Sequence, residues 1–361
     1  MKEKRVIISG GGTGGHFYPA LVLGQKLQER EPGLELTYVG SSREAEKNIM
    51  ARHKVKFVPM KIEGLKGRGF RSLKALAMLP GSFFKSLSIL LRIKPDLVVG
   101  VGGFSSGPIV LLASLMKIPT VILEQNLRPG FTNRLLLPRV RKAVVAFEAS
   151  LIHFKQKGIF LGNPVRGEFY RIPPKERGER LTLLVFGGSQ GSHFLNQALV
   201  AALPLLKKAH DRLAIFHQTG PTDFEWVRQS YAQGGFGETV VAPYFYEMPN
   251  YFQKADLVIS RAGATTCAEL IAARKAAVLI PFAQATDNHQ AQNAGELKRV
   301  GGAEVILEAE FTPQRLAEKI LFFLEHRDRI SEMEKSLDLL KKDGAADRIA
   351  GLCFELMETR G

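Results

Sequence analysis

The sequence contains the same arrangement in both halves, an apolar strand that runs directly into a glycine-rich turn. The strand Val6–Ser9 leads into SGGGTGGH at Ser9–His16, and the strand Leu181–Phe186 leads into GGSQGSH at Gly187–His193. Glycine permits the sharp turn by which a buried strand passes into a helix. Each motif therefore predicts the start of a parallel strand-and-helix unit, and their likeness predicts two similar domains.

Strands and helices alternate through the rest of each half. Asp96–Val101 is a buried strand followed by the turn Gly102–Gly107, and Leu257–Ser260 is followed by a helix over Thr265–Ala273. This alternation is typical of parallel sheets that are covered on both faces. We therefore expect two Rossmann-like, doubly wound α/β domains facing a cleft. Residues 1–162 would form the N-terminal domain, residues 163–344 the C-terminal domain, and residues 345–361 a final helix that packs back on the first domain.

The net charge of +15 is concentrated in the first half of the chain. Residues 1–162 hold 26 Lys and Arg against 10 Asp and Glu, whereas the remainder holds 24 against 25. A basic domain beside a neutral one indicates an anionic partner for the first domain only. That partner could be a nucleic acid, an acidic membrane surface or a phosphorylated substrate. We see no basic face interleaved with aromatic residues and no nucleic-acid-binding motif, so we expect no nucleic acid.

One stretch of the basic half, Leu65–Lys94, is both apolar and rich in Lys and Arg. Its centre, Ala75–Phe84, is uncharged, and Pro80 and Gly81 are expected to break it, so it should not span a bilayer. It could lie on an anionic membrane surface, or it could be a pair of core helices with exposed lysines. The other uncharged run, Leu97–Met116, is interrupted by glycines, which predicts a buried strand, a turn and a buried helix.

The N-terminal residues and the cysteines lead us to expect a cytoplasmic protein. Met1–Arg5 is short and charged and runs straight into a strand, unlike a signal peptide. Cys267 and Cys353 have neither disulfide-framework nor metal-ligand spacing, which fits a reducing compartment.

The first glycine turn satisfies G-x-G-x-x-G through Gly10, Gly12 and Gly15. A dinucleotide fold also needs an acidic residue at the end of the second strand, but that strand ends Val39-Gly40-Ser41-Ser42-Arg43. A nicotinamide-dependent oxidoreductase is therefore disfavoured. The turn is either a phosphate site made of backbone N–H groups at a helix start or a plain tight turn.

Two polar sites follow strands of the first half. His16 opens the first helix, where the helix dipole favours a neutral imidazole that can accept a proton from a hydroxyl; it could also merely cap the turn. Glu124-Gln125-Asn126 follows a short strand, at the sheet edge where α/β folds bind ligands.

The second half offers a matching set of polar groups. Gly187–Gly191 supplies N–H groups and the Ser189 hydroxyl to a phosphate, which Arg166 could neutralise unless it is a plain surface charge. Glu269 lies four residues after Thr265, on the same helix face, so its carboxylate can reach ribose hydroxyls at the helix start; an electrostatic helix-start glutamate is the alternative. The polar run Asp287–Asn293 suits sugar hydroxyls or a solvated loop.

We expect a site without metal. The sequence has no Asp-x-Asp pair and no His, Cys and Asp cluster with metal-ligand spacing. Helix dipoles and Arg166 would then stabilise a leaving diphosphate.

Seven motifs in order resemble the MurG family, the bacterial peptidoglycan transferases that add N-acetylglucosamine to undecaprenyl-diphospho-muramoyl-pentapeptide. They are GGGTGGHFYPA, VGGFSSGP, EQN, GNPVR, FGGSQGS, SRAGATTCAEL and the Gln290/Asn293 loop. The resemblance covers nearly the whole chain and implies a GT-B architecture. It also implies an inverting reaction in which a 4-hydroxyl attacks UDP-N-acetylglucosamine and UDP leaves, with no cofactor. A peripheral enzyme on the cytoplasmic face of the bacterial inner membrane is expected.

The resemblance also implies roles for individual residues. Donor contacts would come from Thr13, Gly14, Gly15, Asn126, Arg166, Ser189, Phe245, Ala264, Thr265, Thr266, Cys267, Ala268, Glu269 and Gln290. The acceptor diphosphate would lie at Gly14, Gly15, Gly102, Gly103, Ser105 and Ser106. We expect His16 to be the catalytic base, with Glu124 as the second candidate. Members often have histidine before the Glu-Gln-Asn motif, where this chain has Leu123.

Other enzymes share this two-domain layout. A UDP-sugar epimerase or another GT-B glycosyltransferase would fit the same motifs. An epimerase needs no lipid acceptor, so the apolar basic stretch would then have no purpose.

Overall fold

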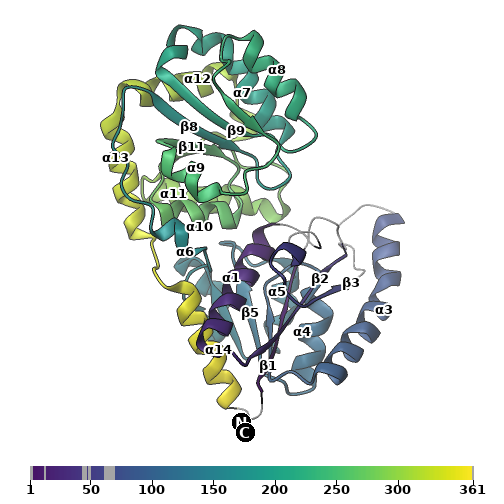
Figure 1. The fold of residues 1–361 in the computed structure, drawn as a ribbon. Coiled ribbons are helices and arrows are strands. Elements are labelled where there is room, and N and C mark those ends of the chain that lie inside the picture. Colours follow the sequence, from purple (N-terminus) through teal and green to yellow (C-terminus); the bar gives the residue numbers. More distant parts are fainter. Residues whose placement is uncertain (1–2, 12–13, 43–46, 48–49, 61–69, 360–361) are drawn as a thin grey trace. The chain divides into compact units, whose positions relative to one another are not determined.

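Two parallel sheets, one in each of two units, organise the chain (Figure 1). The structure is a computed structural model of the 361-residue chain, and it describes all residues except 1–2, 12–13, 43–46, 48–49, 61–69 and 360–361. The first unit comprises Met1–Val165 together with Gly344–Gly361, and the second comprises Arg166–Asp343.

The first unit contains, among the described residues, a seven-stranded sheet in the order β3-β2-β1-β4-β5-β6-β7. All its strand pairs are parallel, and the direction of winding reverses between β1 and β4, where Ser9 is paired with Gly100. Ligands of doubly wound sheets bind at the carboxyl ends of strands beside such a reversal. The strands are β1 (Arg5–Ser9), β2 (Glu35–Ser41), β3 (Phe57–Met60), β4 (Leu97–Gly100), β5 (Thr120–Glu124), β6 (Lys142–Val145) and β7 (Gly158–Phe160).

Helices cover both faces of this sheet because successive strand residues point to opposite sides. Ile8 of β1 packs in one cluster with α1 and α14, whereas Ile7 packs in another with α3 and α4. The helical segments of this unit are α1 (Gly14–Arg30), α3 (Phe70–Ile93), α4 (Ser106–Leu115), α5 (Phe131–Leu136), η1 (Glu148–His153), η2 (Lys155–Lys157) and α14 (Ala345–Glu358).

The last helix of the chain, α14, packs against the first, α1. Ile349 and Cys353 of α14 are fully buried in the same cluster as Leu23 and Leu27 of α1. Arg348 Nη2 of α14 also donates to the carbonyl oxygen of Leu161, which follows β7, at 3.1 Å. The first unit therefore takes its final helix from the far end of the chain.

The expected break at Pro80 and Gly81 is wrong, since α3 is one continuous helix over Phe70–Ile93. A proline removes one backbone N–H and crowds the preceding turn, which weakens a helix without necessarily ending it. Downstream of the proline, Ser86, Ile89 and Leu90 are buried, and Ser86 Oγ donates to the carbonyl of Ser82 at 2.7 Å. This packing stabilises the helix more than the proline weakens it.

The second unit contains, within the described part of the chain, a six-stranded sheet in the order β10-β9-β8-β11-β12-β13. Every pair is parallel, and the winding reverses between β8 and β11, where Phe186 is paired with Ser260. The strands are β8 (Leu181–Phe186), β9 (Leu213–Gln218), β10 (Val240–Ala242), β11 (Leu257–Ser260), β12 (Ala277–Leu279) and β13 (Ala303–Val305).

Its helical segments again lie on both sides of the sheet (Figure 1). They are α6 (Gly167–Tyr170), α7 (His193–Leu206), η3 (Lys207–Arg212), α8 (Phe224–Gln233), α9 (Met248–Lys254), α10 (Ala264–Ala273), η4 (Thr286–Asn288), α11 (His289–Arg299), η5 (Glu308–Glu310), α12 (Pro313–Glu325), α13 (Arg327–Ser336) and η6 (Leu337–Leu339).

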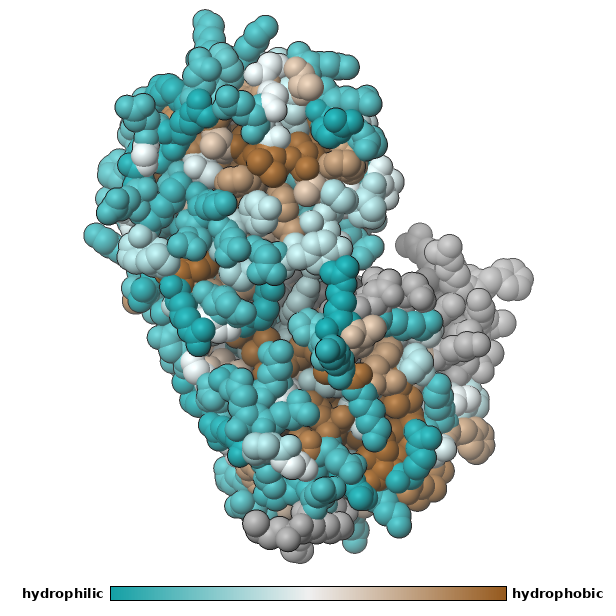
Figure 2. All heavy atoms as spheres, in the orientation of Figure 1, coloured by the Kyte–Doolittle hydropathy of each residue, from teal (hydrophilic) through white to brown (hydrophobic). Residues whose placement is uncertain are grey.

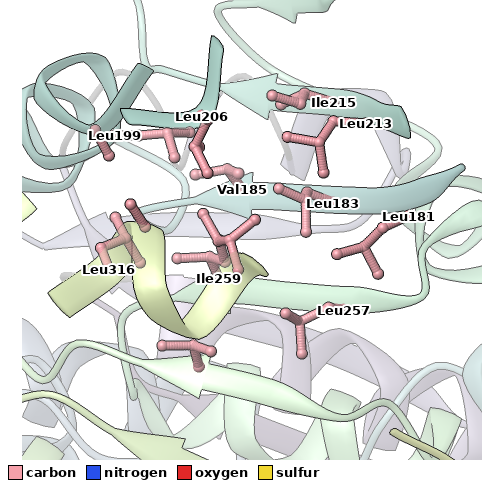
Figure 3. Close-up of a cluster of buried hydrophobic side chains, with 14 of the residues drawn as sticks. Leu181, Leu183, Val185, Leu199, Leu206, Leu213, Ile215, Leu257, Ile259 and Leu316 are labelled. Atoms are coloured by element: carbon pink, nitrogen blue, oxygen red, sulfur yellow. The ribbon is translucent and has the colours of Figure 1, made fainter. Parts of the chain in front are cut away.

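One core layer of this unit is shown in Figure 3. Leu183 and Val185 of β8 and Ile259 of β11 point toward Leu199 of α7 and Leu316 of α12, and all five are fully buried. Burying one such side chain stabilises the fold by roughly 1.5–3 kcal/mol. The result is a rigid sheet whose carboxyl-end turns are held in place, and the prediction of two doubly wound α/β domains is confirmed.

Candidate active site

In the first unit, the two glycine turns that follow β1 and β4 touch each other. A Cβ atom placed on Gly103 would lie 2.2 Å from the carbonyl oxygen of Gly11, so only glycine fits there. Gly102 and Gly103 have φ angles of +89° and +79°, which other residues rarely adopt. The turns are tied further by Ser9 Oγ, which donates to the carbonyl of Ser105 at 3.2 Å. The turn after β4 therefore lies directly against Ser9 and Gly11, where the turn after β1 begins.

His16 lies close to the turn after β4. It is half-buried in the first turn of α1, and a Cβ placed on Gly102 would be 2.9 Å from its Nε2. Of its expected neighbours, Gly14 and Gly15 begin α1, whereas Thr13 lies outside the described residues. The structure thus brings His16 to the turn that follows β4.

The two serines of the second turn are buried. Ser106 Oγ donates to the carbonyl of Gly103 at 2.9 Å and so holds the turn onto the start of α4. Ser105 is 2% exposed, and its hydroxyl has no hydrogen-bond partner among the described residues. Their side chains therefore support the turn from within rather than line its surface.

Glu124, at the end of β5, is enclosed by hydrogen-bond donors. Its Oε1 accepts from the backbone N–H and the Nδ2 of Asn126 at 3.0 and 3.2 Å, and its Oε2 accepts from Gly130 N at 2.8 Å and Asn133 Nδ2 at 2.9 Å. Burial raises the pKa of this carboxyl, while the four donors lower it. Since all four partners are donors, the geometry favours the ionised carboxylate.

This arrangement fixes Asn126, which is half-buried at the same sheet edge. Gln125 between them is buried, and its Nε2 donates to the carbonyl of Val101 at 3.0 Å. The loop after β5 is thereby tied to the turn after β4, which brings the Glu-Gln-Asn segment close to the glycine turns.

In the second unit, Gly188 and Gly191 have φ angles of +99° and +76° in the turn after β8, and Ser189 between them is half-buried. Ser192 is the N-cap of α7, and its Oγ accepts from Leu195 N at 3.4 Å. A helix that begins with such a turn directs its unpaired N–H groups at the ligand edge.

Gln218, at the end of β9, was not singled out from the sequence, yet it links two expected donor contacts. Its Nε2 donates to the carbonyl of Gly188 at 2.9 Å, and its Oε1 accepts from Phe245 N at 2.8 Å. The Phe245 ring stacks on Tyr251 with centroids 3.8 Å apart. The backbone N–H of Phe245 is already bonded to Gln218. A nucleobase that contacts the Phe245 backbone would therefore bond to its carbonyl oxygen, unless the bond to Gln218 breaks. The position of Gln218, a polar residue at the carboxyl end of a strand, could have indicated from the sequence that it belongs to the site.

The start of α10 follows β11, beside the turn after β8. Ala264, Thr265, Thr266 and Ala268 lie in its first turns, with Ala264 and Cys267 buried. Burial raises the pKa of Cys267 to about 12, and its thiol is 0% exposed. Cys267 therefore presents no surface to a ligand, unlike the half-buried threonines.

Glu269 lies one turn further along α10. It is 8% exposed, and its Oε1 is 3.4 Å from Nη2 of Arg166. Burial raises its pKa to about 7, although Arg166 opposes this rise. The Arg166 guanidinium lies 5.0 Å from the centroid of the Phe169 ring. The structure thus brings together the arginine and the glutamate that the sequence placed 103 residues apart.

The loop after β12 carries the last expected contact. Gln290 is half-buried near the start of α11, and its Oε1 accepts from Phe282 N at 3.0 Å. Asn293 is fully buried and donates through Nδ2 to the carbonyl of Ala262 at 3.3 Å. Asn293 therefore connects α11 to the turn before α10 rather than reaching outward.

A second unpredicted feature is Arg261, which directly follows β11 and is 6% exposed. It bonds to the turn that follows β8 through Ser192 Oγ at 3.0 Å. The sequence offered no partner for it, because its contacts are spread over three other segments. In the described part of the chain, no group of three or more His, Cys, Asp or Glu could hold a metal ion.

Comparisons with known proteins find matches over nearly the whole chain. Residues 6–145 match the glycosyltransferase family 28 N-terminal domain, and residues 182–349 match the family's C-terminal domain. A Myxococcus xanthus protein is 43% identical over 357 residues, which is 98% of this chain and 93% of the relative. It is named UDP-N-acetylglucosamine–N-acetylmuramyl-(pentapeptide) pyrophosphoryl-undecaprenol N-acetylglucosamine transferase.

Solved structures give the same result. The crystal structure of Acinetobacter baumannii MurG has a TM-score of 0.76 and 28% identity, covering 98% of this chain and 99% of that one. A UDP-GlcNAc 2-epimerase from Neisseria meningitidis, bound to UDP-GlcNAc, has a TM-score of 0.68 at 14% identity, covering 97% and 100%. The epimerase shares the fold alone. With two family 28 domains and a full-length relative at 43% identity, this chain belongs to the MurG family of GT-B glycosyltransferases.

Proposed function

We propose that this chain transfers N-acetylglucosamine from UDP-N-acetylglucosamine to the 4-hydroxyl of lipid-linked muramoyl-pentapeptide, converting lipid I to lipid II in peptidoglycan synthesis. Its membership of the MurG family supports the reaction. The structural observation that carries the proposal is the pairing of two helix-opening turns on neighbouring strands, β8 and β11, with the Arg166–Glu269 pair on the second helix.

The donor diphosphate is proposed to lie over the turns that open α7 and α10. Because β8 and β11 are adjacent, the N–H groups of both helix starts lie at the same sheet edge, where their dipoles attract negative charge. Ser189, Thr265 and Thr266 add hydroxyls at this edge. As UDP leaves, the same groups would stabilise the charge that develops on its diphosphate.

The ribose is proposed to bind Glu269. An ionised carboxylate accepts from two neighbouring hydroxyls, and Arg166 beside it keeps part of the site positive for the donor. Asn126 and Gln290 are proposed to contact the sugar, and the Phe245 backbone to contact the uracil base.

The acceptor is proposed to place its diphosphate on the joined turns of the first unit, beside His16. In the reaction, the 4-hydroxyl oxygen attacks the anomeric carbon and forms the new glycosidic bond. The bond from that carbon to the UDP oxygen breaks, and UDP departs with its electron pair, so the configuration inverts. The hydroxyl proton passes to the neutral imidazole of His16.

Glu124 fits a positioning role better than that of a second base. Both of its oxygens already accept two hydrogen bonds each, which leaves little capacity for a substrate proton. We infer that Glu124 holds Asn126 and the loop after β5 in place.

The first unit is proposed to rest on an anionic membrane on the cytoplasmic side, as a peripheral protein. Figure 2 shows brown, apolar surface gathered on this unit over α4 and between α5 and α3. Among the described residues, the large exposed apolar side chains of these helices and of Met116, which follows α4, are Phe84, Leu91, Leu115, Met116, Phe131 and Leu135. Exposed basic residues lie among them, including Lys85, Arg92, Lys117 and Arg134. Apolar side chains with basic neighbours are suited to the headgroup region of an acidic leaflet.

The side chains of residues 70–79, and residues 65–69 altogether, lie outside the described part of the chain, so the support comes from the later part of α3 and from α4 and α5. Among the helices described, none is both long and apolar enough to cross a membrane.

A transfer assay tests the function directly. The purified protein is mixed with UDP-N-acetylglucosamine and a short-chain lipid-diphospho-muramoyl-pentapeptide, with and without chelator, and the products are read by mass spectrometry. We expect an acceptor heavier by one N-acetylhexosamine, together with UDP, under both conditions. Product only without chelator would remove the metal-free mechanism and keep the reaction. Conversion of the UDP-sugar alone, without transfer, would favour the epimerase alternative.

A further inference from the structure

Arg261 joins the loops that follow three neighbouring strands of the second unit. It directly follows β11 and is 6% exposed. Its Nε donates to Ser192 Oγ, in the turn after β8, at 3.0 Å. Its Nη1 donates to the carbonyl oxygen of Ile280, just after β12, at 3.0 Å. One side chain therefore bridges the carboxyl-end loops of β8, β11 and β12.

Further contacts fix the plane of its guanidinium. Nη1 also forms an ion pair with Glu308 of η5 at 2.5 Å. The guanidinium carbon lies 5.2 Å from the ring centroid of Phe194 and 5.5 Å from that of Phe282. A planar guanidinium can stack on aromatic rings while its rigid fork donates in fixed directions to several acceptors, whereas the ammonium of lysine is a compact charge without this fork.

Ser192, the residue that Arg261 holds, closes the glycine turn after β8. It is packed so tightly against Gly187 that a Cβ on Gly187 would lie 2.3 Å from the Ser192 Cβ. Its Oγ is also the cap of α7, accepting from Leu195 N. A shift of Ser192 therefore shifts both the turn and the first N–H groups of α7.

We propose that Arg261 is a positioning residue for the donor diphosphate. Through Ser192, it fixes the start of α7 relative to the start of α10, so that the N–H groups of both helices meet the same phosphates. This inference rests on the donor site proposed above. Arg261 needs no contact of its own with the donor, because it acts through the turn.

The substitution Arg261→Lys tests the proposal, because it keeps the charge and removes the fork. Its matched control is Arg274→Lys at the opposite end of α10, where Arg274 pairs on the surface with Asp338 and both side chains are about half exposed. UDP affinity is measured by calorimetry and uridine affinity by NMR titration. We expect Arg261→Lys to weaken UDP binding about tenfold, the loss typical of one charge-assisted hydrogen bond, and to change uridine binding less than about twofold. Arg274→Lys should change neither.

The outcomes separate this inference from the proposed function. If the unmodified protein does not bind UDP, the proposed donor site fails. If it binds UDP and Arg261→Lys binds UDP equally well, the positioning role is overturned. An equal loss of UDP and uridine binding would also overturn it, because that indicates a general structural defect.

Ser192→Ala tests the same bond from the other side and replaces Arg261→Lys if that variant does not fold. Both substitutions remove the Arg261–Ser192 hydrogen bond through which the proposed positioning acts, so the double variant should bind UDP within about twofold of the weaker single variant. If the two losses multiply, the residues act independently and the proposal is wrong.

Discussion

The substitution Glu269→Gln should stabilise the protein at neutral and alkaline pH and should weaken the binding of UDP-N-acetylglucosamine. Burial raises the pKa of Glu269 from 4.5 to about 7, so folding favours the protonated carboxyl. The stabilisation that this proton provides is complete below pH 4.5 and is lost as the pH rises through 7. Glutamine carries no charge at any pH, so the variant does not lose this stability.

The size of the effect follows from the pKa difference. One pKa unit corresponds to about 1.4 kcal/mol, so ionising Glu269 in the folded protein costs about 3 kcal/mol, roughly 2–3 kcal/mol of which develops between pH 5 and pH 8. The pKa of about 7 already includes the attraction of Arg166, whose Nη2 lies 3.4 Å from Oε1 of Glu269, so this contact adds no separate change with pH. The informative quantity is therefore the change with pH of the difference in unfolding free energy.

Urea unfolding of both proteins at pH 5, 6, 7 and 8 provides this difference. The variant should gain about 2–3 kcal/mol relative to the unmodified protein across the series. Glu225→Gln is the control, because Glu225 is exposed and pairs with Arg228 on the surface of α8. The difference in unfolding free energy between Glu225→Gln and the unmodified protein should not change with pH. A flat difference for Glu269→Gln as well would refute the raised pKa.

Donor binding supplies the second half of this test. An ionised Glu269 is needed to accept from ribose hydroxyls, so affinity for UDP-N-acetylglucosamine should rise from pH 6 to pH 8. For Glu269→Gln the affinity should be about tenfold lower at pH 8 and should not depend on pH in this range. Calorimetry that finds equal affinities at pH 8 would remove Glu269 from the donor site.

Three further predictions concern the first unit. His16→Ala should lower turnover by about 10²–10⁴-fold with UDP affinity kept, as expected for a lost general base, whereas His153→Ala at an exposed position should do neither; near-normal turnover would exclude His16 as the base. Glu124→Gln should lower the unfolding free energy by about 1–3 kcal/mol, because an amide NH₂ would face N–H donors; an unchanged melting temperature would contradict the hydrogen-bond assignment. Phe84→Asp should reduce co-sedimentation with anionic vesicles, whereas Leu205→Asp in the second unit should not; equal binding by both would exclude the proposed membrane face.

The sequence predicted the parts of this fold that depend on local patterns. Leu181–Phe186 and Leu257–Ser260 are strands with the same bounds in the structure as in the sequence analysis, because short apolar runs before glycine turns have few other solutions. The course of α3 through Pro80 was not predictable, since the contacts that stabilise it come from packing against the sheet.

The candidate site was predictable in its motifs and not in its connections. The glycine turns, His16 and Glu269 are recognisable from local spacing. The partners of Arg261 are separated from it by 69 residues on one side and by up to 47 on the other, so no pattern near Arg261 points to them. Glu124 looks like a free acid in the sequence, and only the folded loop shows that Asn133 and Gly130 occupy its oxygens.

The membership of α14 in the first unit sets an order of folding during synthesis. Ile349, Cys353 and Leu356 complete a core that begins at Val6, so this core stays open until the residues of α14 have left the ribosome. The second unit runs without interruption from Arg166 to Asp343 and has no such dependence. Although domains usually fold in the order in which they are made, here the domain encoded second is the first that can finish.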